Sequence, residues 1–408
     1  MEEALQGALA RAAGRPSVGY TAPNVGKVGS SVVLDPNSGA VLAMASYPTF
    51  KPTEFIDGIS DSEWAFLTDP ANHHPLNNWA IQGQYAPGST FKPFTAEAAL
   101  SAGLISPSST VYDTGEFTVP NCTGGTCVFK NDGSKAYGMV DLRRSLTVSS
   151  DFYYYNLGAR FWIEQDALGG AEAFRQQLEK WGFNRQTGID LTGEEDGRIP
   201  SPEWLDSYCA QVECLEDVWR TGDNVNMAIG QGAVLLTPLQ LAVAYGAVGN
   251  GGTLWQPHVA REVLDGVTGE VKRTIDPVAN GKVELTPEWQ QALVEGLLGV
   301  TTREGGTAVS AFSGFPSSAY PVAAKTGTAQ VTKKAPTAVF GAFGPAHAPQ
   351  YAVSVLLEES GYGGSVAAPV ARRIFDLLSG TVPMPVAQEG GKVEEQGELV
   401  GEGGDVRD

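Results

Sequence analysis

Apolar residues gather in two groups of short runs, one near the start of the chain and one near its end. The two early runs are separated by a Pro-Asn-Ser-Gly stretch, and these residue types favour the tight turn of a β-hairpin. Three more runs of strand length follow late in the chain. The five strands that this pattern predicts cover residues 29–35, 40–46, 322–328, 338–343 and 351–357.

The long stretch between these groups, and the segment after the last strand, are patterned as helices. Thr237 is a suitable N-cap, and Pro238 suits the first position of a helix that is apolar nearly all round and therefore buried. An aromatic cluster at residues 152–155 is predicted to belong to the core. The helices that we expect cover residues 5–13, 89–100, 140–146, 152–158, 174–181, 238–245, 287–300 and 368–378.

This order of elements predicts an α/β protein of the α+β kind. We expect a five-stranded antiparallel sheet flanked by helices on both faces, with an all-helical middle that packs as a lobe against the strand at 322–328. Residues 1–386 would form this one domain. Residues 387–408 hold seven acidic and two basic residues, six glycines and no aromatic residue, so we expect a disordered acidic tail.

The overall composition narrows the range of partners. The 408 residues are 42 % hydrophobic, enough for a large core, and their formal net charge is −19. A chain this acidic is poorly suited to bind nucleic acid or to dock on anionic lipid. No apolar run approaches the about 20 residues that are needed to cross a bilayer.

The four cysteines fall into two local pairs, each with four residues between its members. The pairs are Cys122 with Cys127 and Cys209 with Cys214, and the four histidines do not complete a zinc site of usual spacing. We therefore expect two short-range disulfides and an oxidising, extracytoplasmic compartment. The alternative is four reduced thiols.

Ser89 and Lys92 stand three residues apart at the start of the helix expected at 89–100. On a helix this spacing places two side chains on one face, with Cβ atoms about 5–6 Å apart. A lysine whose pKa is lowered by burial can take the proton of a serine hydroxyl and so activate it as a nucleophile. The alternative is a capping serine with a solvated lysine, because S-x-x-K also arises by chance.

Two further motifs favour the catalytic interpretation. A Ser-Ser-Asp stretch at residues 149–151 and a Lys-Thr-Gly stretch at residues 325–327 follow the S-x-x-K motif in that order. S-x-x-K together with S-D-N and K-T-G is the signature of penicillin-binding proteins and serine β-lactamases. Here an aspartate takes the place of the asparagine.

On these motifs, residues 30–378 resemble the transpeptidase domain of class B penicillin-binding proteins. Residues 35–48, 85–88, 229–232 and 237–240 are also similar to family patterns. The aromatic residues after the second motif, and residues 325–330, are most similar to the elongation-type members. Those members act in cell shape and partner a membrane glycan polymerase; division-type relatives are the alternative.

The resemblance implies a mechanism of cell-wall cross-linking. Ser89 attacks the carbonyl between the two terminal D-alanines of a peptidoglycan stem peptide, with Lys92 as base. Ser149 relays a proton to the departing D-alanine, and its orientation is set by Lys92, Asp151 and Lys325. The amine of a second stem peptide then takes the acyl group. β-Lactams mimic the donor peptide and leave a stable acyl-enzyme.

The resemblance also assigns substrate contacts to the third motif. The hydroxyls of Thr326 and Thr328, on either side of Gly327, would hold the terminal carboxylate of the donor together with Lys325. The backbone N–H groups of Ser89 and Thr328 would form the oxyanion hole. No cofactor or metal is implied.

Asp151 and Trp79 depart from the residues most common in the family. An ionised Asp151 beside Lys92 would raise the pKa of that lysine, which opposes its work as a base. The site could tolerate this if Lys325 pairs mainly with Asp151. The alternative is that Asp151 only caps a local turn and points away from both lysines.

Proteins with two other functions could also carry the three motifs. A serine β-lactamase would need a base that activates water, for which Glu194, Glu195 and Glu213 are the candidates. A non-catalytic sensor or interaction domain would bind β-lactams without transferring a peptide. We favour the transpeptidase, at the extracytoplasmic face of the membrane, with an N-terminal anchor that is absent from this chain.

Overall fold

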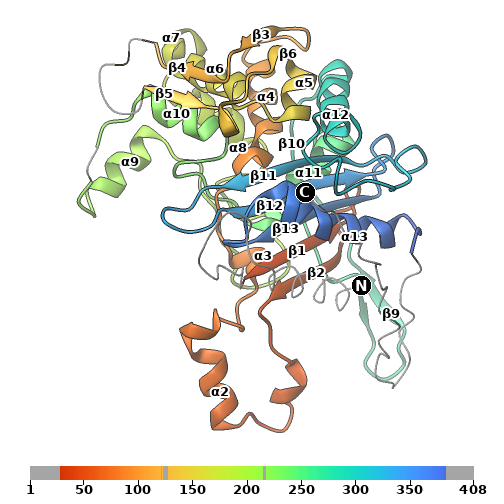
Figure 1. Ribbon diagram of the computed structural model, residues 1–408. Coiled ribbons are helices and arrows are strands. Elements are labelled where there is room, and N and C mark those ends of the chain that lie inside the picture. The colour runs from red at the N-terminus through yellow and green to blue at the C-terminus, as the bar shows by residue number, and fades with distance from the viewer. Residues whose placement is uncertain (1–27, 121, 123–126, 215–216, 383–408) are drawn as a thin grey trace, which may run out of the picture.

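A five-stranded antiparallel sheet lies at the centre of the computed structural model, with strand order β11-β12-β13-β1-β2 (Figure 1). The structure describes residues 28–120, 122, 127–214 and 217–382, so the helix expected at 5–13 and the acidic tail at 387–408 lie outside the described residues. The strands are β1 (Gly29–Leu34), β2 (Val41–Tyr47), β11 (Ala323–Ala329), β12 (Thr337–Gly344) and β13 (Tyr351–Leu357).

The sheet unites the two groups of strands that are far apart in sequence. β1 pairs with β2 across the predicted hairpin turn, with Val33 opposite Ala43. On its other edge β1 pairs with β13, with Val33 opposite Val353. The predicted five-stranded antiparallel sheet is therefore confirmed.

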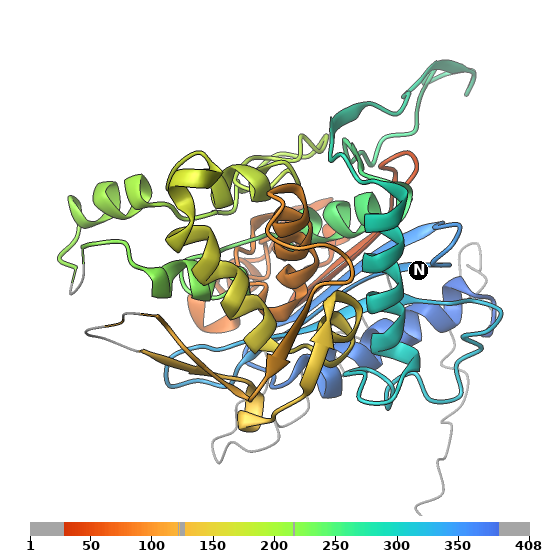
Figure 2. The same cartoon turned by 90° about the horizontal axis from the view of Figure 1, so that it is seen from above.

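Helices cover both faces of this sheet, as expected. Successive side chains of a strand point to opposite faces, so Val32 enters the core beneath α11 (Pro238–Asn250), whereas Val33 enters the core beneath α13 (Ala368–Leu378). Figure 2 shows the green helix α11 and the blue helix α13 on opposite sides of the strands. Four of the five strands are thus buried almost throughout, whereas the edge strand β2 is mostly only partly buried.

A lobe built mainly of helices stands at one side of the sheet, at the top of Figure 1. Its helices are η3 (Gly88–Phe91), α4 (Lys92–Ser101), α5 (Leu142–Val148), α6 (Asp151–Ile163), α7 (Gln165–Leu168), α8 (Ala173–Glu179), α9 (Pro202–Cys209) and α10 (Thr221–Ala228). The expectation that this middle part is all-helical is wrong, because it also contains two small antiparallel sheets. They pair β3 (Thr110–Asp113) with β6 (Gly138–Asp141), and β4 (Glu116–Thr118) with β5 (Val128–Lys130).

The remaining elements surround the sheet or project from it. Among them, α12 packs against α5 and β11, and the segment that carries α2 projects at the bottom of Figure 1. These helices are η1 (Pro52–Phe55), α2 (Asp61–Thr68), η2 (Pro70–Asn72), α3 (Trp79–Gln82), η4 (Asp132–Ser134), α12 (Pro287–Thr302) and η5 (Gly363–Ala367). The other small sheets pair β7 (Thr253–Trp255) with β10 (Ala279–Lys282) and β8 (Glu262–Leu264) with β9 (Val271–Thr274). In the described part of the chain, no helix has both the length and the apolar character to cross a membrane.

Candidate active site

Ser89 lies in the 3₁₀ turn η3, which runs directly into α4 at Lys92. The backbone N–H of Lys92 donates a hydrogen bond to the carbonyl of Ser89, so the two residues are one turn apart, as their spacing predicts. Ser89 is partly exposed, whereas Lys92 is 0 % exposed. A nucleophile that substrate can reach therefore stands next to a lysine that water cannot.

The strand β11 meets the Ser89 turn at the level of the backbone. A Cβ atom at Gly327 would lie 2.5 Å from the carbonyl oxygen of Pro87, and one at Gly88 would lie 3.1 Å from the backbone nitrogen of Thr328. The first contact is too close for any residue except glycine, and the second is tighter than most Cβ contacts, at a glycine whose φ of 54° already disfavours other residues. They bring the backbone of Thr328 beside that of Ser89, as a shared oxyanion hole requires.

Ser149 ends α5 in the left-handed conformation, with φ 60° and ψ 41°. This conformation costs a residue other than glycine about 1–2 kcal/mol and persists only where its surroundings hold it. Here it directs both the carbonyl oxygen and the hydroxyl of Ser149 to the Nζ atom of Lys92, at 2.8 Å and 3.0 Å. Two oxygen atoms of Ser149, in the second motif, thus bind Lys92 of the first motif.

The third partner of Lys92 is Asp151, whose Oδ1 atom lies 2.6 Å from Nζ. The three N–H bonds of the ammonium group are then all used, and the ring of Tyr154 lies 5.3 Å from the same nitrogen. Lys325 instead donates to the carbonyl oxygen of Thr326, at 3.1 Å.

Asp151 thus lies beside Lys92, as the catalytic interpretation expected, but the turn-cap alternative and the pairing mainly with Lys325 are both wrong. It does not point away from the lysines, and it pairs with Lys92 rather than mainly with Lys325. The reason lies in the helix packing. Asp151 is the first residue of α6, and α6 packs against α4, so its carboxylate meets the lysine of α4 first.

Burial shifts the titration of both lysines. It lowers the pKa of Lys92, although the charge and hydrogen bond of Asp151, and then the charge of Asp113, act in the opposite direction. Burial also lowers the pKa of Lys325 well below its ordinary value, and the charge of Lys92 adds to this effect. A lowered pKa is what a lysine needs to act as a general base.

The third motif lines the sheet side of the site. The Oγ1 atom of Thr326 lies 2.6 Å from that of Thr307, and the Oγ1 atom of Thr328 accepts the N–H of Gly363 at 3.1 Å. Lys325 is 0 % exposed on the same strand. Two threonine hydroxyls beside a buried amine form a suitable anchor for a carboxylate.

Several polar neighbours of the motifs were missed by the sequence analysis. Gln231 donates to the carbonyl oxygen of Thr328 at 3.2 Å, and its only signal was its place in an Ile-Gly-Gln-Gly stretch of family type. Tyr154 is buried core, as predicted for its cluster, yet it also faces Lys92. Thr307 and Asp113 had no sequence signal.

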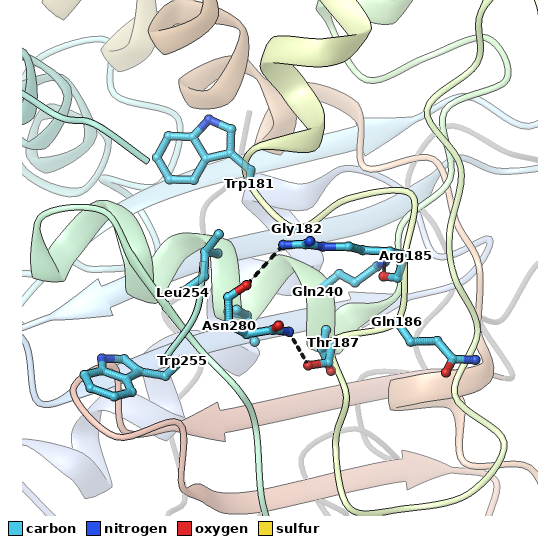
Figure 3. A pocket seen from close by; sticks show the side chains of 10 residues that line it. Trp181, Gly182, Arg185, Gln186, Thr187, Gln240, Leu254, Trp255 and Asn280 are labelled. Carbon is cyan, nitrogen blue, oxygen red and sulfur yellow. Dashed lines mark hydrogen bonds between the residues drawn. The ribbon is translucent and has the colours of Figure 1, made fainter. Parts of the chain in front are cut away.

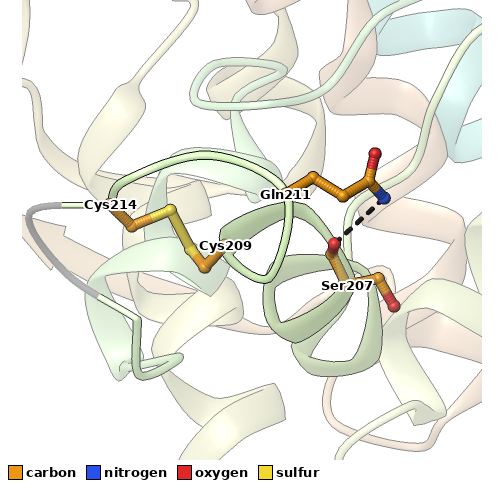
Figure 4. The surroundings of a disulfide bond; sticks show 4 residues. All are labelled: Ser207, Cys209, Gln211 and Cys214. Carbon is orange, nitrogen blue, oxygen red and sulfur yellow. Dashed lines mark hydrogen bonds between the residues drawn. A yellow bond between two sulfur atoms is a disulfide. The ribbon is translucent and has the colours of Figure 1, made fainter.

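The four cysteines form two disulfides in the structure. Cys122 is joined to Cys127 beyond the end of the β4–β5 hairpin, and Cys209 is joined to Cys214 after α9 (Figure 4). The contacts described above among the three motifs come from other residues. Among the described residues, no group of three or more His, Cys, Asp or Glu side chains could hold a metal ion.

The three glutamates that were the candidate water-activating bases of a β-lactamase bind other groups or are exposed. Glu194 accepts hydrogen bonds from the backbone N–H groups of Thr187 and Gly188, at 2.8 Å and 3.0 Å. Glu195 accepts from the side chain of Gln84 at 3.0 Å, and Glu213 is exposed. In the described part of the chain, no contact joins these carboxylates to the motif residues.

Trp79 also lies outside the contacts of the motifs. Its ring packs near that of Tyr85, with centroids 6.5 Å apart. Nothing in the structure explains the departure from the family residue at this position.

A small cavity lined by residues of α11, β7 and β10, and of the segment after α8, includes no residue of the motifs. Figure 3 shows Trp181, Arg185, Gln240 and Asn280 among the side chains that line it. Its volume of about 10 Å³ leaves room for about one water molecule. We therefore place the candidate active site at the three motifs, on the seam between the helical lobe and β11.

Comparison with known proteins identifies the fold that carries this site. Residues 29–376 match the penicillin binding protein transpeptidase domain. The chain belongs to this family. The family expected from the three motifs is thereby confirmed, and the five-stranded sheet with its helical lobe is the fold of its solved members.

Similar proteins of this family include one named for its reaction. The chain is 32 % identical over 372 residues to the peptidoglycan D,D-transpeptidase MrdA of Acinetobacter baumannii, covering 86 % of this chain and 50 % of that protein. The chain spans about half the length of the curated relatives that it matches.

Two solved structures of this family are also similar. The crystal structure of Pseudomonas aeruginosa PBP2 in complex with WCK 5153 has 33 % identity and a TM-score of 0.76, over 92 % of this chain and 74 % of that one. The complex between PBP2 and MreC from Helicobacter pylori has 28 % identity and a TM-score of 0.71, over 87 % and 61 %.

Proposed function

We propose that this domain is a peptidoglycan D,D-transpeptidase that cross-links stem peptides through an acyl-enzyme on Ser89. The observation that carries the proposal is the position of Lys92. It is fully buried, one turn from the accessible Ser89, and bonded to both Ser149 and Asp151. The name of the MrdA relative agrees with this chemistry.

Acylation begins when neutral Lys92 takes the proton of the Ser89 hydroxyl. The Oγ atom of Ser89 then attacks the carbonyl carbon of the penultimate D-alanine, and the backbone N–H groups of Ser89 and Thr328 stabilise the oxyanion. The hydroxyl of Ser149, 3.0 Å from the Nζ atom of Lys92, passes the proton on to the departing nitrogen. An ester bond to Ser89 forms as the amide bond breaks, and D-alanine leaves.

The donor peptide is oriented by its terminal carboxylate. The hydroxyls of Thr326 and Thr328 would bind this group, and the charge of the carboxylate would favour protonated Lys325. The amine of a second stem peptide then attacks the ester and restores the Ser89 hydroxyl. β-Lactams present a similar carboxylate and amide, which is why we expect them to acylate the same serine.

One pair of assays separates this function from its alternatives. The domain is incubated with a fluorescent penicillin and, separately, with a thioester donor that ends in D-alanine. We expect a label that persists for many minutes and release of D-alanine from the donor. Rapid loss of the label would support a β-lactamase, and a stable label without D-alanine release would support a sensor.

Replacing the nucleophile gives the first testable prediction. Ser89→Ala should abolish covalent labelling, because it removes the partly exposed hydroxyl one turn from Lys92, and should leave the melting temperature within a few degrees. Ser62→Ala, at an exposed position of α2, is the control and should label normally. A covalent adduct on another serine of the Ser89→Ala protein would contradict the assignment.

We further infer an elongation-type role, with a membrane glycan polymerase as partner, at the extracytoplasmic face of the membrane. The MrdA and PBP2 relatives and the solved complex of one PBP2 with MreC support this role. The two disulfides support an oxidising compartment.

A further inference from the structure

The second motif presents alternate residues to two different surroundings. Ser149 and Asp151 face Lys92, and bind it through two oxygens of Ser149 and one of Asp151. Ser150 and Phe152, the residues that alternate with them, make their hydrogen bonds elsewhere. Partners other than Lys92 therefore also hold this segment in place.

Asp113 and Asn131 supply that other side. The hydroxyl of Ser150 donates to the Oδ2 atom of Asp113 at 2.5 Å, and the backbone N–H of Phe152 donates to the Oδ1 atom of Asn131 at 2.8 Å. Ser150 also caps α6 by accepting the N–H of Tyr153 at 3.2 Å. Two of the first N–H groups of α6 are thus satisfied by this arrangement.

The two partners also bind each other tightly. The amide nitrogen of Asn131 donates to both carboxylate oxygens of Asp113 at 2.9 Å and to the carbonyl of Lys135 at 2.7 Å. The N–H of Gly115 is the third donor to Asp113, at 2.8 Å. These three donors are all neutral groups, and each makes a charge-assisted hydrogen bond to the carboxylate.

This carboxylate is costly to bury. Asp113, Asn131 and Ser150 are 0 %, 3 % and 0 % exposed, and among the described residues no lysine or arginine lies within ion-pair distance of Asp113. A buried charge without a cation is tolerated only where its hydrogen bonds are complete. Fully satisfied polar networks of this kind fix one local geometry.

The geometry that the network fixes includes the left-handed Ser149. The N–H groups of Ser149 and Ser150 both donate to the carbonyl of Ser145, which anchors the segment on its N-terminal side. On the C-terminal side, the anchors are Ser150 and the first turn of α6. Without them, residue 149 could relax to a common backbone conformation and withdraw its hydroxyl from Lys92.

We propose that Asp113 and Asn131 are positioning residues for the proton relay, because they hold the Ser149–Asp151 segment against Lys92 through Ser150 and Phe152. They do not touch the substrate. The inference rests on the proposed function only in assigning Ser149 and Lys92 to the acylation step. The short strand β3, which carries Asp113, and the base of the β4–β5 hairpin, which carries Asn131, thereby support catalysis.

The test uses Asp113→Asn, Ser150→Ala and the two changes combined, in the whole chain. A fluorescent penicillin gives the acylation rate constant and the dissociation constant of the complex that precedes acylation, well below the melting temperature. Misplacement of a relay group costs about 10- to 100-fold in rate. We expect each variant to lose this much in the rate constant while the dissociation constant stays within about twofold, since neither residue binds the ligand.

Two features of the result separate positioning from general stability. The double variant should be no slower than the slower single variant, because both changes cut the same link. Ser150→Thr keeps the hydroxyl and should restore most of the rate, and this pair of variants remains informative if Asp113→Asn does not fold. Glu97→Ala removes another buried carboxyl, bound to Trp181, and should lower the melting temperature without slowing acylation.

The proposal is overturned if the rate falls only as much as in Glu97→Ala, or if the two changes slow acylation independently. These outcomes are distinct from failure of the proposed function. A domain that is acylated but releases no D-alanine from a donor peptide would not be a transpeptidase, and the comparison of acylation rates would still decide the role of Asp113.

Discussion

On the sheet side of the site, Lys325 and Thr328 take their places from backbone pairing, because they stand opposite Gly341 and Ala338 in the regular ladder of β11 and β12. On the helical side, Ser149 stands between two helices, outside any such ladder. Its position depends on side chains that come from other parts of the chain. The sheet side therefore follows from the fold, whereas the helical side depends on a few specific polar contacts.

The two buried lysines differ in the same way, in how many hydrogen-bond partners their amines have. Both are 0 % exposed, but Lys92 has three oxygen partners, whereas the described hydrogen bonds of Lys325 include only the carbonyl of Thr326. Lys92 is thus part of what holds the lobe together. Lys325 is a poorly satisfied amine that would gain a strong partner when a carboxylate binds.

Replacing each lysine by methionine tests this difference and should have the largest effect. Both variants should lose about 100-fold or more in acylation rate, as expected for loss of a proton-transfer or anchoring group. Lys92→Met should also lower the melting temperature, because it leaves Asp151 without its partner; breaking a fully buried pair costs about 3–5 kcal/mol, and Asp151 is partly exposed, so the loss should be smaller. Lys325→Met should leave the melting temperature unchanged or raise it.

Thermal unfolding and acylation kinetics of the two proteins check these outcomes together. Lys51→Met, at a side chain that is 81 % exposed, is the control and should change neither quantity. If Lys325→Met lowers the melting temperature as much as Lys92→Met does, the two lysines are equally structural and the contrast between the two sides is wrong.

The same contrast explains what the sequence could predict. The strand β13 and the helix α13 were predicted with the bounds that they have, because β13 is a nearly continuous apolar run and the buried residues of α13 recur at helical spacing. The S-x-x-K turn was predicted because its two residues are neighbours on one helix. In both cases the information is local.

The helical side could not be predicted in this detail. Asp113 and Asn131 lie 37 and 21 residues from their partners Ser150 and Phe152, on or beside strands of only three or four residues. Segments this short have no readable period, and β6 was absorbed into the helix predicted at 140–146. Asp151 pairs with Lys92 because of how α6 packs on α4, and the spacing of the motifs in the sequence does not predict this packing.

Replacing Asp151 should move the pH dependence of acylation. Burial lowers the pKa of Lys92, whereas the Asp151 carboxylate raises it, and so does Asp113 to a lesser degree. In Asp151→Asn the stronger opposing charge is gone, so the pKa of Lys92 falls further and the neutral base forms at lower pH. The pH at which acylation reaches half its maximum should therefore decrease.

A series of acylation rates from low to high pH measures this shift. Lys325 and the ring of Tyr154 also face Lys92, and neither is changed by the substitution. Asp265→Asn, at an exposed hairpin, is the control and should leave the profile in place. A profile that does not move in Asp151→Asn would mean that Lys92 is not the group whose deprotonation limits acylation.

The two disulfides can be compared directly, because each closes a loop with the same sequence separation of 5. The expected effect on acylation is the smallest of those considered. In the chain-entropy description, loops of this length each contribute about 2 kcal/mol to stability. Replacing either pair by serine should therefore lower the melting temperature by similar amounts. The difference lies in what each loop adjoins: β5 leads from Cys127 directly to Asn131, whereas Cys209 ends α9, which supplies none of the hydrogen bonds described above for the second motif.

We accordingly expect the Cys122→Ser, Cys127→Ser protein to lose about two- to threefold in acylation rate, equivalent to about 0.5 kcal/mol. The Cys209→Ser, Cys214→Ser protein should acylate at the original rate and is the matched control. Mass spectrometry of non-reduced peptides should first find each pair linked in the starting protein. Equal acylation by the two variants would mean that the hairpin does not support Asn131, even if Asn131 itself positions the second motif.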